Sequence, residues 1–114
     1  MDSLPIINKT YEVYKEIIDI NNKLQKRMSY TLGVSIENSI IACMEHLIMA
    51  KNAPKSLKAV YLIRASSQLE ITAIKLRLFL ELRLANETKI FQTQMKIAEI
   101  GRMLGGWLKA TQST

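Results

Sequence analysis

The residues that could support catalysis or bind a metal are few in this chain. Its one histidine, His46, lies three residues after its one cysteine, Cys43, and directly after Glu45. A zinc site needs three or four protein ligands, and no second cysteine or histidine exists to complete one. A cysteine nucleophile would also need an oxyanion hole, which the middle of a helix rarely supplies. The sequence therefore predicts no enzyme, no metal and no cofactor, with Cys43 in the core and His46 on a helix surface or at an interface.

Positive charge is the more informative chemical feature. The chain carries a formal net charge of +6, and residues 51–83 hold seven lysines and arginines against two glutamates, which leaves +5 on that segment. A local excess of this size favours a polyanionic partner, with nucleic acid first. A lysine- and arginine-rich face also serves plain solubility, and charge alone leaves both readings open.

Four helices are needed to position these groups. Thr31, Ser56 and Asn86 are predicted to open the second, third and fourth helices, and Pro54 marks the turn before the third. Short connections between long helices are typical of an antiparallel up-down bundle. The sequence thus predicts an all-α, single-domain antiparallel up-down four-helix bundle over residues 1–114, with a frayed tail at 111–114 and helices at about 7–28, 32–51, 57–84 and 87–107.

The third predicted helix carries more apolar surface than one bundle needs. At about 100° per residue, one stripe should face the core of the chain itself: Leu62, Leu69, Ala73, Leu76, Leu80 and Leu84. A second stripe lies on another side of the helix and indicates self-association, most simply a homo-oligomer. The alternative is that it packs against a third helix inside a tight bundle. The second stripe consists of Ile71, Ile74, Leu78 and Leu82.

Polar sectors separate these two stripes. One holds Arg64, Gln68, Thr72 and Lys75 without an acidic neighbour, and it is therefore the better candidate for contacts with phosphates. The other holds Arg77 and Glu81, whose spacing of four suits a surface ion pair.

Glycine is concentrated near the C-terminus, where Gly101, Gly105 and Gly106 precede the only tryptophan, Trp107. A glycine inside a helix costs about 1 kcal/mol relative to alanine. Because Gly101 and Gly105 share one helix face, they predict close helix packing, with Trp107 filling the neighbouring space.

The cellular setting follows from small signals. The lone cysteine fits a reducing compartment, and the N-terminus lacks the pattern of a signal peptide. Charges interrupt the apolar runs short of the roughly 18 residues that a membrane span needs. We therefore expect a cytoplasmic protein without a membrane segment.

Several motifs together resemble a known family. They are Thr31-Leu32-Gly33 before Ile36-Glu37-Asn38-Ser39, then Leu82-Arg83-Leu84-Ala85, and above all the segment Ile97–Lys109. Over about residues 6–110 the chain resembles the accessory variability determinant (Avd) of diversity-generating retroelements. A related four-helix family, encoded in intervening sequences of 23S ribosomal RNA genes, has a hallmark segment at the start of its second helix that is absent here.

The resemblance implies a function. Such proteins form homopentameric barrels with a basic surface, bind the reverse transcriptase of the element, and with it engage template RNA during cDNA synthesis in which adenines are miscopied. They are not catalysts themselves. Arg83, Lys75 and Arg77 are carried over as contacts to RNA or polymerase, and Arg64 is added from its polar sector. The alternative is a structural oligomerising bundle without a nucleic-acid role. The full set of candidate nucleic-acid contacts is Arg64, Lys75, Arg77, Arg83, Lys55 and Lys58.

Overall fold

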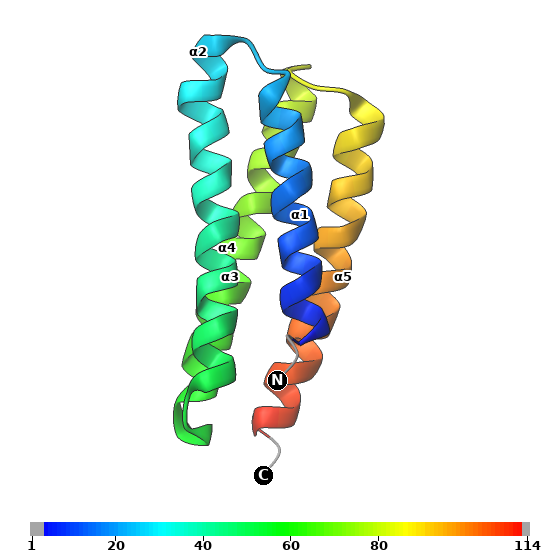
Figure 1. Ribbon diagram of the computed structural model, residues 1–114. Coiled ribbons are helices and arrows are strands. Elements are labelled where there is room, and N and C mark those ends of the chain that lie inside the picture. Colours follow the sequence, from blue (N-terminus) through cyan, green and yellow to red (C-terminus); the bar gives the residue numbers. More distant parts are fainter. Residues whose placement is uncertain (1–3, 113–114) are drawn as a thin grey trace.

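In the computed structural model, the chain is described from residue 4 to residue 112, and this range forms an elongated helical molecule of 48 × 23 × 21 Å (Figure 1). No strand occurs in the range, so the predicted all-helical class is confirmed. The short α2 and the π-helical turn η1 lead into α3. The elements are α1 (Pro5–Asn22), α2 (Lys26–Met28), η1 (Ser29–Gly33), α3 (Val34–Asn52), α4 (Lys55–Glu81) and α5 (Glu87–Gln112).

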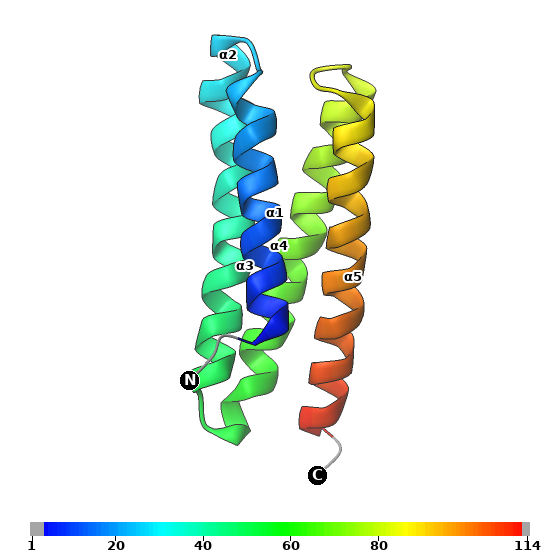
Figure 2. The same cartoon turned by 45° about the vertical axis from the view of Figure 1, so that its right-hand side comes forward.

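The four long helices lie side by side. Both α1 and α4 contact α3 and α5, which gives a closed four-membered arrangement. Figure 2 shows two connections at the upper end of the molecule, one through α2 and η1 and one between α4 and α5. The turn between α3 and α4 lies at the lower end, as do the first residues of α1 and the last of α5. This placement brings segments 23–33 and 82–86 to the same end.

One apolar core fills the space between the helices. The predicted inner stripe of α4 is confirmed, because Leu62, Leu69 and Leu76 are buried and Ala73, Leu80 and Leu84 pack partly buried against the same core. The largest side chain that is fully buried is Phe79. The other long helices supply buried residues at helical spacing, which include Val13, Ile17, Ile20, Ile36, Ile40, Leu47, Ile90, Ile100 and Leu104.

The first helix ends earlier than predicted, and Thr31 does not open a helix. The chain leaves α1 at Asn22 and resumes helical structure at Lys26. Thr31 lies inside the π-helical turn, where its hydroxyl donates to the carbonyl of Arg27 at 3.0 Å. The amide of Asn21 donates to the Gly33 carbonyl at 2.8 Å, so a side chain of α1 ties down the widened turn. A Cβ on Gly33 would lie 3.2 Å from Asn21 Cγ, a tight contact that would require the Asn21 side chain to shift slightly.

The other helix ends fit the predictions in part. Asn86 caps α5 as predicted, since its side-chain oxygen accepts from the amide of Lys89 at 2.9 Å. Ser56 makes no cap, because α4 already begins at Lys55 after the extended Pro54. Helix α5 continues to Gln112, beyond its predicted end, so the tail expected from Thr111 begins inside a helix, and its last two residues lie outside the described range.

One helix bears on the expected absence of a membrane segment. The continuous helical stretch Lys26–Asn52 is long and apolar enough to cross a membrane, judged by length and composition alone. Only Glu37 and Glu45 interrupt residues 32–50, so the expectation that charges break every apolar run was too strict. In the structure, Ile36, Ile40 and Leu47 of this stretch are fully buried between helices, as in the core helix of a bundle.

Candidate nucleic-acid and assembly surfaces

The second apolar stripe of α4 lies on the surface. Ile71, Ile74, Leu78 and Leu82 are exposed to 40%, 51%, 36% and 53%, so no helix of the described chain covers them. This contradicts the alternative that the stripe packs inside the bundle. Three further exposed residues, Leu57, Val60 and Ile63, extend the apolar surface toward the start of the helix. The outer face of α4 is therefore defined by Leu57, Val60, Ile63, Ile71, Ile74, Leu78 and Leu82.

Two of the predicted phosphate contacts are used inside the protein. The Lys75 ammonium donates to the Ser35 carbonyl of α3 at 2.9 Å, and burial holds the pKa of Lys75 below its ordinary value. The Lys58 ammonium donates to the carbonyls of Ala50 and Lys51, at 2.8 and 3.2 Å. It thereby binds the last carbonyls of α3, where a cation is favourable. Both lysines therefore join α3 to α4 through hydrogen bonds to backbone carbonyls.

The polar sector around Lys75 faces α3 and does not face solvent as a whole. Thr72 is fully buried, and its hydroxyl lies 2.9 Å from Ser39 Oγ and 2.8 Å from the Gln68 carbonyl. Of this sector only Arg64 is exposed. The Thr72 and Lys75 part of the predicted polar sector therefore lies at the seam between α3 and α4.

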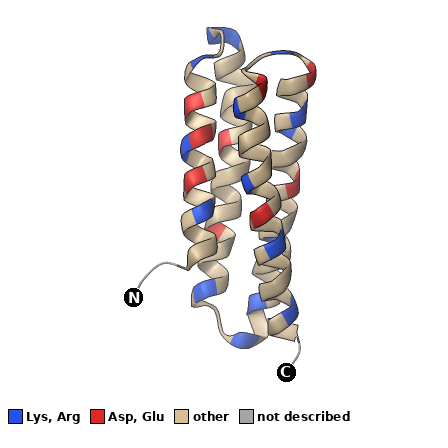
Figure 3. Ribbon diagram, turned by 90° about the vertical axis from the view of Figure 1, so that its right-hand side faces the viewer, with Lys and Arg blue, Asp and Glu red and all other residues tan. Residues whose placement is uncertain are grey.

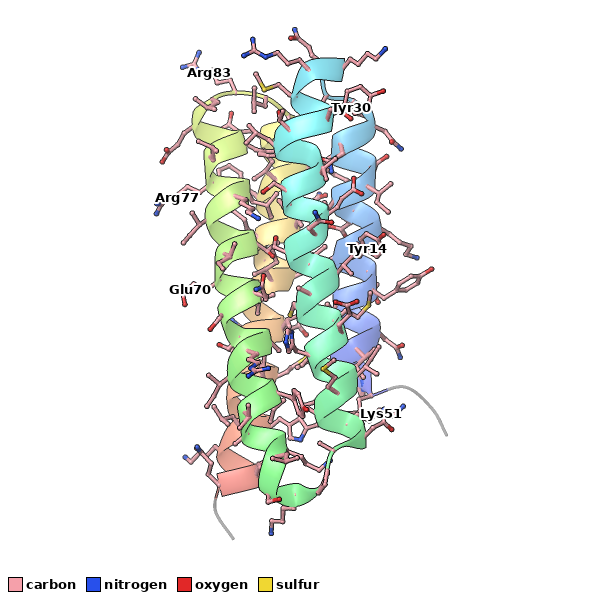
Figure 4. The ribbon with its side chains drawn as sticks, turned by 90° about the vertical axis from the view of Figure 1, so that its left-hand side faces the viewer. Tyr14, Tyr30, Lys51, Glu70, Arg77 and Arg83 are labelled. Carbon is pink, nitrogen blue, oxygen red and sulfur yellow. The ribbon has the colours of Figure 1, made fainter. Side chains whose placement is uncertain are left out.

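The remaining predicted contacts are far apart. Arg77 and Glu70 point away from the bundle, and Arg77 pairs with Glu81 at 3.8 Å as predicted (Figure 4). Lys55 begins α4 and Arg83 follows its end, which separates them by about 40 Å of helix. The structure therefore does not bring the six candidate residues together into one site.

Glycine in α5 does not serve packing within the described chain. A Cβ on Gly101 would lie 3.8 Å from Leu69, an ordinary contact distance, and one on Gly105 or Gly106 would meet nothing within 4 Å. The close contact predicted for Gly101 and Gly105 is therefore absent between the helices of the chain. Trp107 is half-buried and packs against the core, as predicted.

The residues first considered for catalysis, Cys43 and His46, are fully buried and half-buried respectively. Cys43 is fully buried, as predicted, and burial raises the pKa of its thiol to about 12. His46 is half-buried, and its Nδ1 lies 2.8 Å from the Ala42 carbonyl one turn earlier. Within residues 4–112, no group of three or more His, Cys, Asp or Glu side chains is placed to hold a metal ion.

Ion pairs join α1 to α5 on the opposite side of the bundle from the seam between α3 and α4. Lys9 pairs with Glu99 at 3.3 Å, Lys89 with Asp19 at 3.4 Å, and Lys96 with both Glu12 and Glu16. Burial by itself would raise the pKa of Glu16. Hydrogen bonds from Lys96 and Thr93, with the charges of Lys96 and Lys89, outweigh burial and lower this pKa below its ordinary value.

Sequence reasoning missed a group at the upper end of the molecule. Tyr30 is exposed to 67%, and the exposed Lys26 and Arg27 precede it in the short helix α2. Figure 4 shows Tyr30 and Arg83 at this same end. The signal was present in the sequence, since Lys23, Lys26 and Arg27 form a basic run before a tyrosine, but the segment was treated only as a break between helices.

Comparison with known proteins identifies a family. The bAvd-like family model matches residues 4–111, nearly the whole chain. The chain therefore belongs to the bAvd-like family, and the Avd resemblance seen in its motifs is confirmed. A comparison with curated proteins finds no match.

Proposed function

We propose that this bAvd-like protein is a non-enzymatic accessory factor of a diversity-generating retroelement. It is an antiparallel up-down four-helix bundle that assembles with copies of itself into a homopentamer in the cytoplasm. In that form it binds the reverse transcriptase and the template RNA with its cDNA through a basic surface, and supports cDNA synthesis in which template adenines are miscopied.

The observation that carries this proposal is the outer face of α4. Seven apolar side chains on one side of a single helix are 36% to 53% exposed, and no other described helix covers them. A contiguous apolar surface of this kind marks an interaction site, which supports assembly with copies of the same chain. Family membership supports the choice of partners.

Reconstitution tests the proposal directly. The purified protein is combined with the reverse transcriptase encoded beside its gene and with the template RNA, and the cDNA is sequenced. We expect cDNA with substitutions at positions templated by adenine, and its loss when the protein is left out. A gene neighbourhood without a reverse transcriptase, or cDNA of unchanged yield and sequence without the protein, contradicts the proposal.

A second candidate function has one observation in its favour. Lys58, Lys75 and Arg77 are engaged within the chain, which fits a structural oligomerising bundle whose charge serves folding and solubility. The two functions differ in salt dependence, because phosphate contacts make RNA affinity fall with a logarithmic slope of about 0.7 to 0.9 per contact. An oligomer that binds no RNA at low salt, alone or with the polymerase, favours the structural function.

A further inference from the structure

The upper end of the bundle combines basic and aromatic side chains from segments far apart in the sequence. Segments 23–33 and 82–86 form its two connections (Figures 1 and 2). Figure 3 shows lysine and arginine on both of them. The basic end is defined here by Lys23, Lys26, Arg27, Tyr30 and Arg83.

The cations of the basic end have fewer ion-pair partners than those along the helices. In the described part of the chain, no ion pair involves Lys26, Arg27 or Arg83, and all three are exposed. Lys23 lies 3.8 Å from Asp19, which Lys89 also neutralises. Glu87 lies in the first turn of α5, and Glu81, in the last turn of α4, pairs with Arg77. The net charge available here to an incoming ligand is positive.

The exposed aromatic ring of Tyr30 lies beside one of these cations, Lys26. The Lys26 ammonium lies 5.9 Å from the centroid of the Tyr30 ring, which itself is 67% exposed. Proteins that bind single-stranded nucleic acid use this combination, with bases stacked on aromatic rings and phosphates held by neighbouring cations. Double-stranded nucleic acid offers no free base faces to such a ring.

A hollow adjoins the basic end. It has a volume of about 490 Å³ and lies between the end of α1 and the connection from α4 to α5. Its lining holds Lys23 and Lys89 with Asp19, which pairs with both of them. Asn86 and Gln92 supply amides that can hydrogen-bond a base edge. A volume of this order is typical of sites for small ligands, so it accommodates a nucleotide unit.

Arg83 occupies a backbone position that favours glycine. Its φ is 55°, and the Leu84 amide donates to the Phe79 carbonyl at 2.9 Å, so Arg83 is the left-handed residue that ends α4. A side chain here costs stability relative to glycine. An arginine that lies at the tip of a connection despite this cost is consistent with a role in binding.

We propose that the basic end binds single-stranded RNA, with Tyr30 stacked on a base and Lys26, Arg27 and Arg83 in contact with phosphates. The hollow beside Asn86 and Lys89 receives an adjacent nucleotide. The inference rests on the proposed function for the choice of RNA as the nucleic acid, and it moves the contact surface from the length of α4 to one end of the bundle.

Fluorescence anisotropy with a short oligouridine probe tests the proposal. Tyr30→Ala is expected to weaken binding about ten-fold or more, because stacking contributes strongly for each base, whereas Tyr30→Phe keeps most of the affinity. Arg27→Ala should reduce the slope of affinity against salt by about 0.7. Arg83→Gly should weaken binding while it raises the melting temperature by a few degrees, a pairing that a purely structural role does not give.

The chain offers a matched control. Tyr11 is also exposed, to 51%, with the Lys15 ammonium 5.1 Å from its ring centroid, but it lies on α1 beside Glu12. Tyr11→Ala should leave RNA affinity unchanged. Equal affinity of Tyr30→Ala and Tyr11→Ala, or equal binding of duplex RNA and oligouridine, overturns the inference.

The outcomes also separate this inference from the proposed function. If the wild type binds oligouridine but the three basic-end variants bind as well as it does, the inference fails and the accessory function stands. If the wild type binds an acidic peptide and no RNA, the inference also fails, and reconstitution with the polymerase alone decides the proposed function.

Discussion

The junction between α1 and α5 differs from the outer face of α4 in how far its side chains have partners within the chain. Between α1 and α5, four lysine–carboxylate pairs cross from helix to helix. Lys9 of α1 pairs with a carboxylate of α5, and Lys89 and Lys96 of α5 pair with carboxylates of α1. On the outer face of α4, apolar side chains such as Ile74 and Leu82 remain more than half exposed. The first surface has its partners within the chain, whereas no described helix covers the second.

The difference shows which part of the charge and apolar content serves folding and which part is left for other molecules. Charges in the middle of the molecule are largely matched by carboxylates or backbone carbonyls, as with Lys75 and Ser35. The longest row of exposed apolar side chains lies along the outside of α4, and exposed cations without a carboxylate partner lie at the basic end. Binding is therefore expected at these two places and not at the junction of α1 and α5.

The largest effect is expected on the outer face of α4. We predict that Ile74→Asp converts the oligomer to a monomer of 13.0 kDa without unfolding it. The side chain is 51% exposed in the single chain, so the bundle tolerates the charge, whereas an interface between copies would bury it unpaired. Light scattering measures the mass, and circular dichroism checks the helix content.

Met95→Asp provides the control for this substitution. Met95 lies on α5 and is 72% exposed, so the same charge is introduced on another helix. It should leave the mass of the oligomer unchanged. A wild type that is already monomeric, or an Ile74→Asp variant that keeps the wild-type mass, contradicts self-association through α4.

A smaller effect is expected at the junction of α1 and α5. Glu16→Gln should lower the free energy of unfolding at pH 7 by about 1 to 2 kcal/mol, because hydrogen bonds to a charged group from Lys96 and Thr93 are weakened. Chemical denaturation measures it, with Ile74→Asp as the background so that assembly does not contribute.

The pH dependence of this effect follows from the pKa of Glu16. The pKa is lowered in the folded state from its ordinary 4.5, so the stabilisation is fully present above pH 4.5 and is lost as the pH falls through the folded value. The difference between wild type and Glu16→Gln should therefore disappear in acid. A difference that stays constant from pH 7 to pH 3 contradicts the assignment.

Helical spacing predicted the helices and the two stripes of α4 well, because period and burial are properties of single helices. The polar residues were harder to place. Thr72 and Lys75 belong to a sector without an acidic neighbour on α4, and their partners Ser39 and Ser35 come from α3. The widened turn at Thr31 depends likewise on Asn21 of another helix. Partners supplied by a different helix cannot be read from the spacing of one.

Substitution of a glycine of α5 should raise the stability of the protein, whereas a role in close packing would predict a loss. Gly105→Ala is expected to raise the free energy of unfolding by about 1 kcal/mol in the Ile74→Asp background, since a Cβ there meets nothing within 4 Å and alanine favours the helix. Thermal unfolding measures the change. A loss of stability in this monomeric background means that Gly105 has a close neighbour within the chain.

The smallest effect is expected for the ion pair on the outer side of α4. Arg77 and Glu81 lie 3.8 Å apart, and both side chains are 66% exposed, whereas the Glu16 side chain at the junction of α1 and α5 is 17% exposed. Exposed pairs at this spacing contribute about 0.3 to 0.5 kcal/mol. Arg77→Ala should therefore change the free energy of unfolding by less than about 0.5 kcal/mol, and the change should vanish at high salt. Denaturation of the Ile74→Asp background with and without 1 M salt checks this. A loss as large as that of Glu16→Gln would mean that Arg77 interacts with more than Glu81. The ion pair on the outer side of α4 would then contribute as much to stability as those at the junction of α1 and α5, which contradicts the comparison.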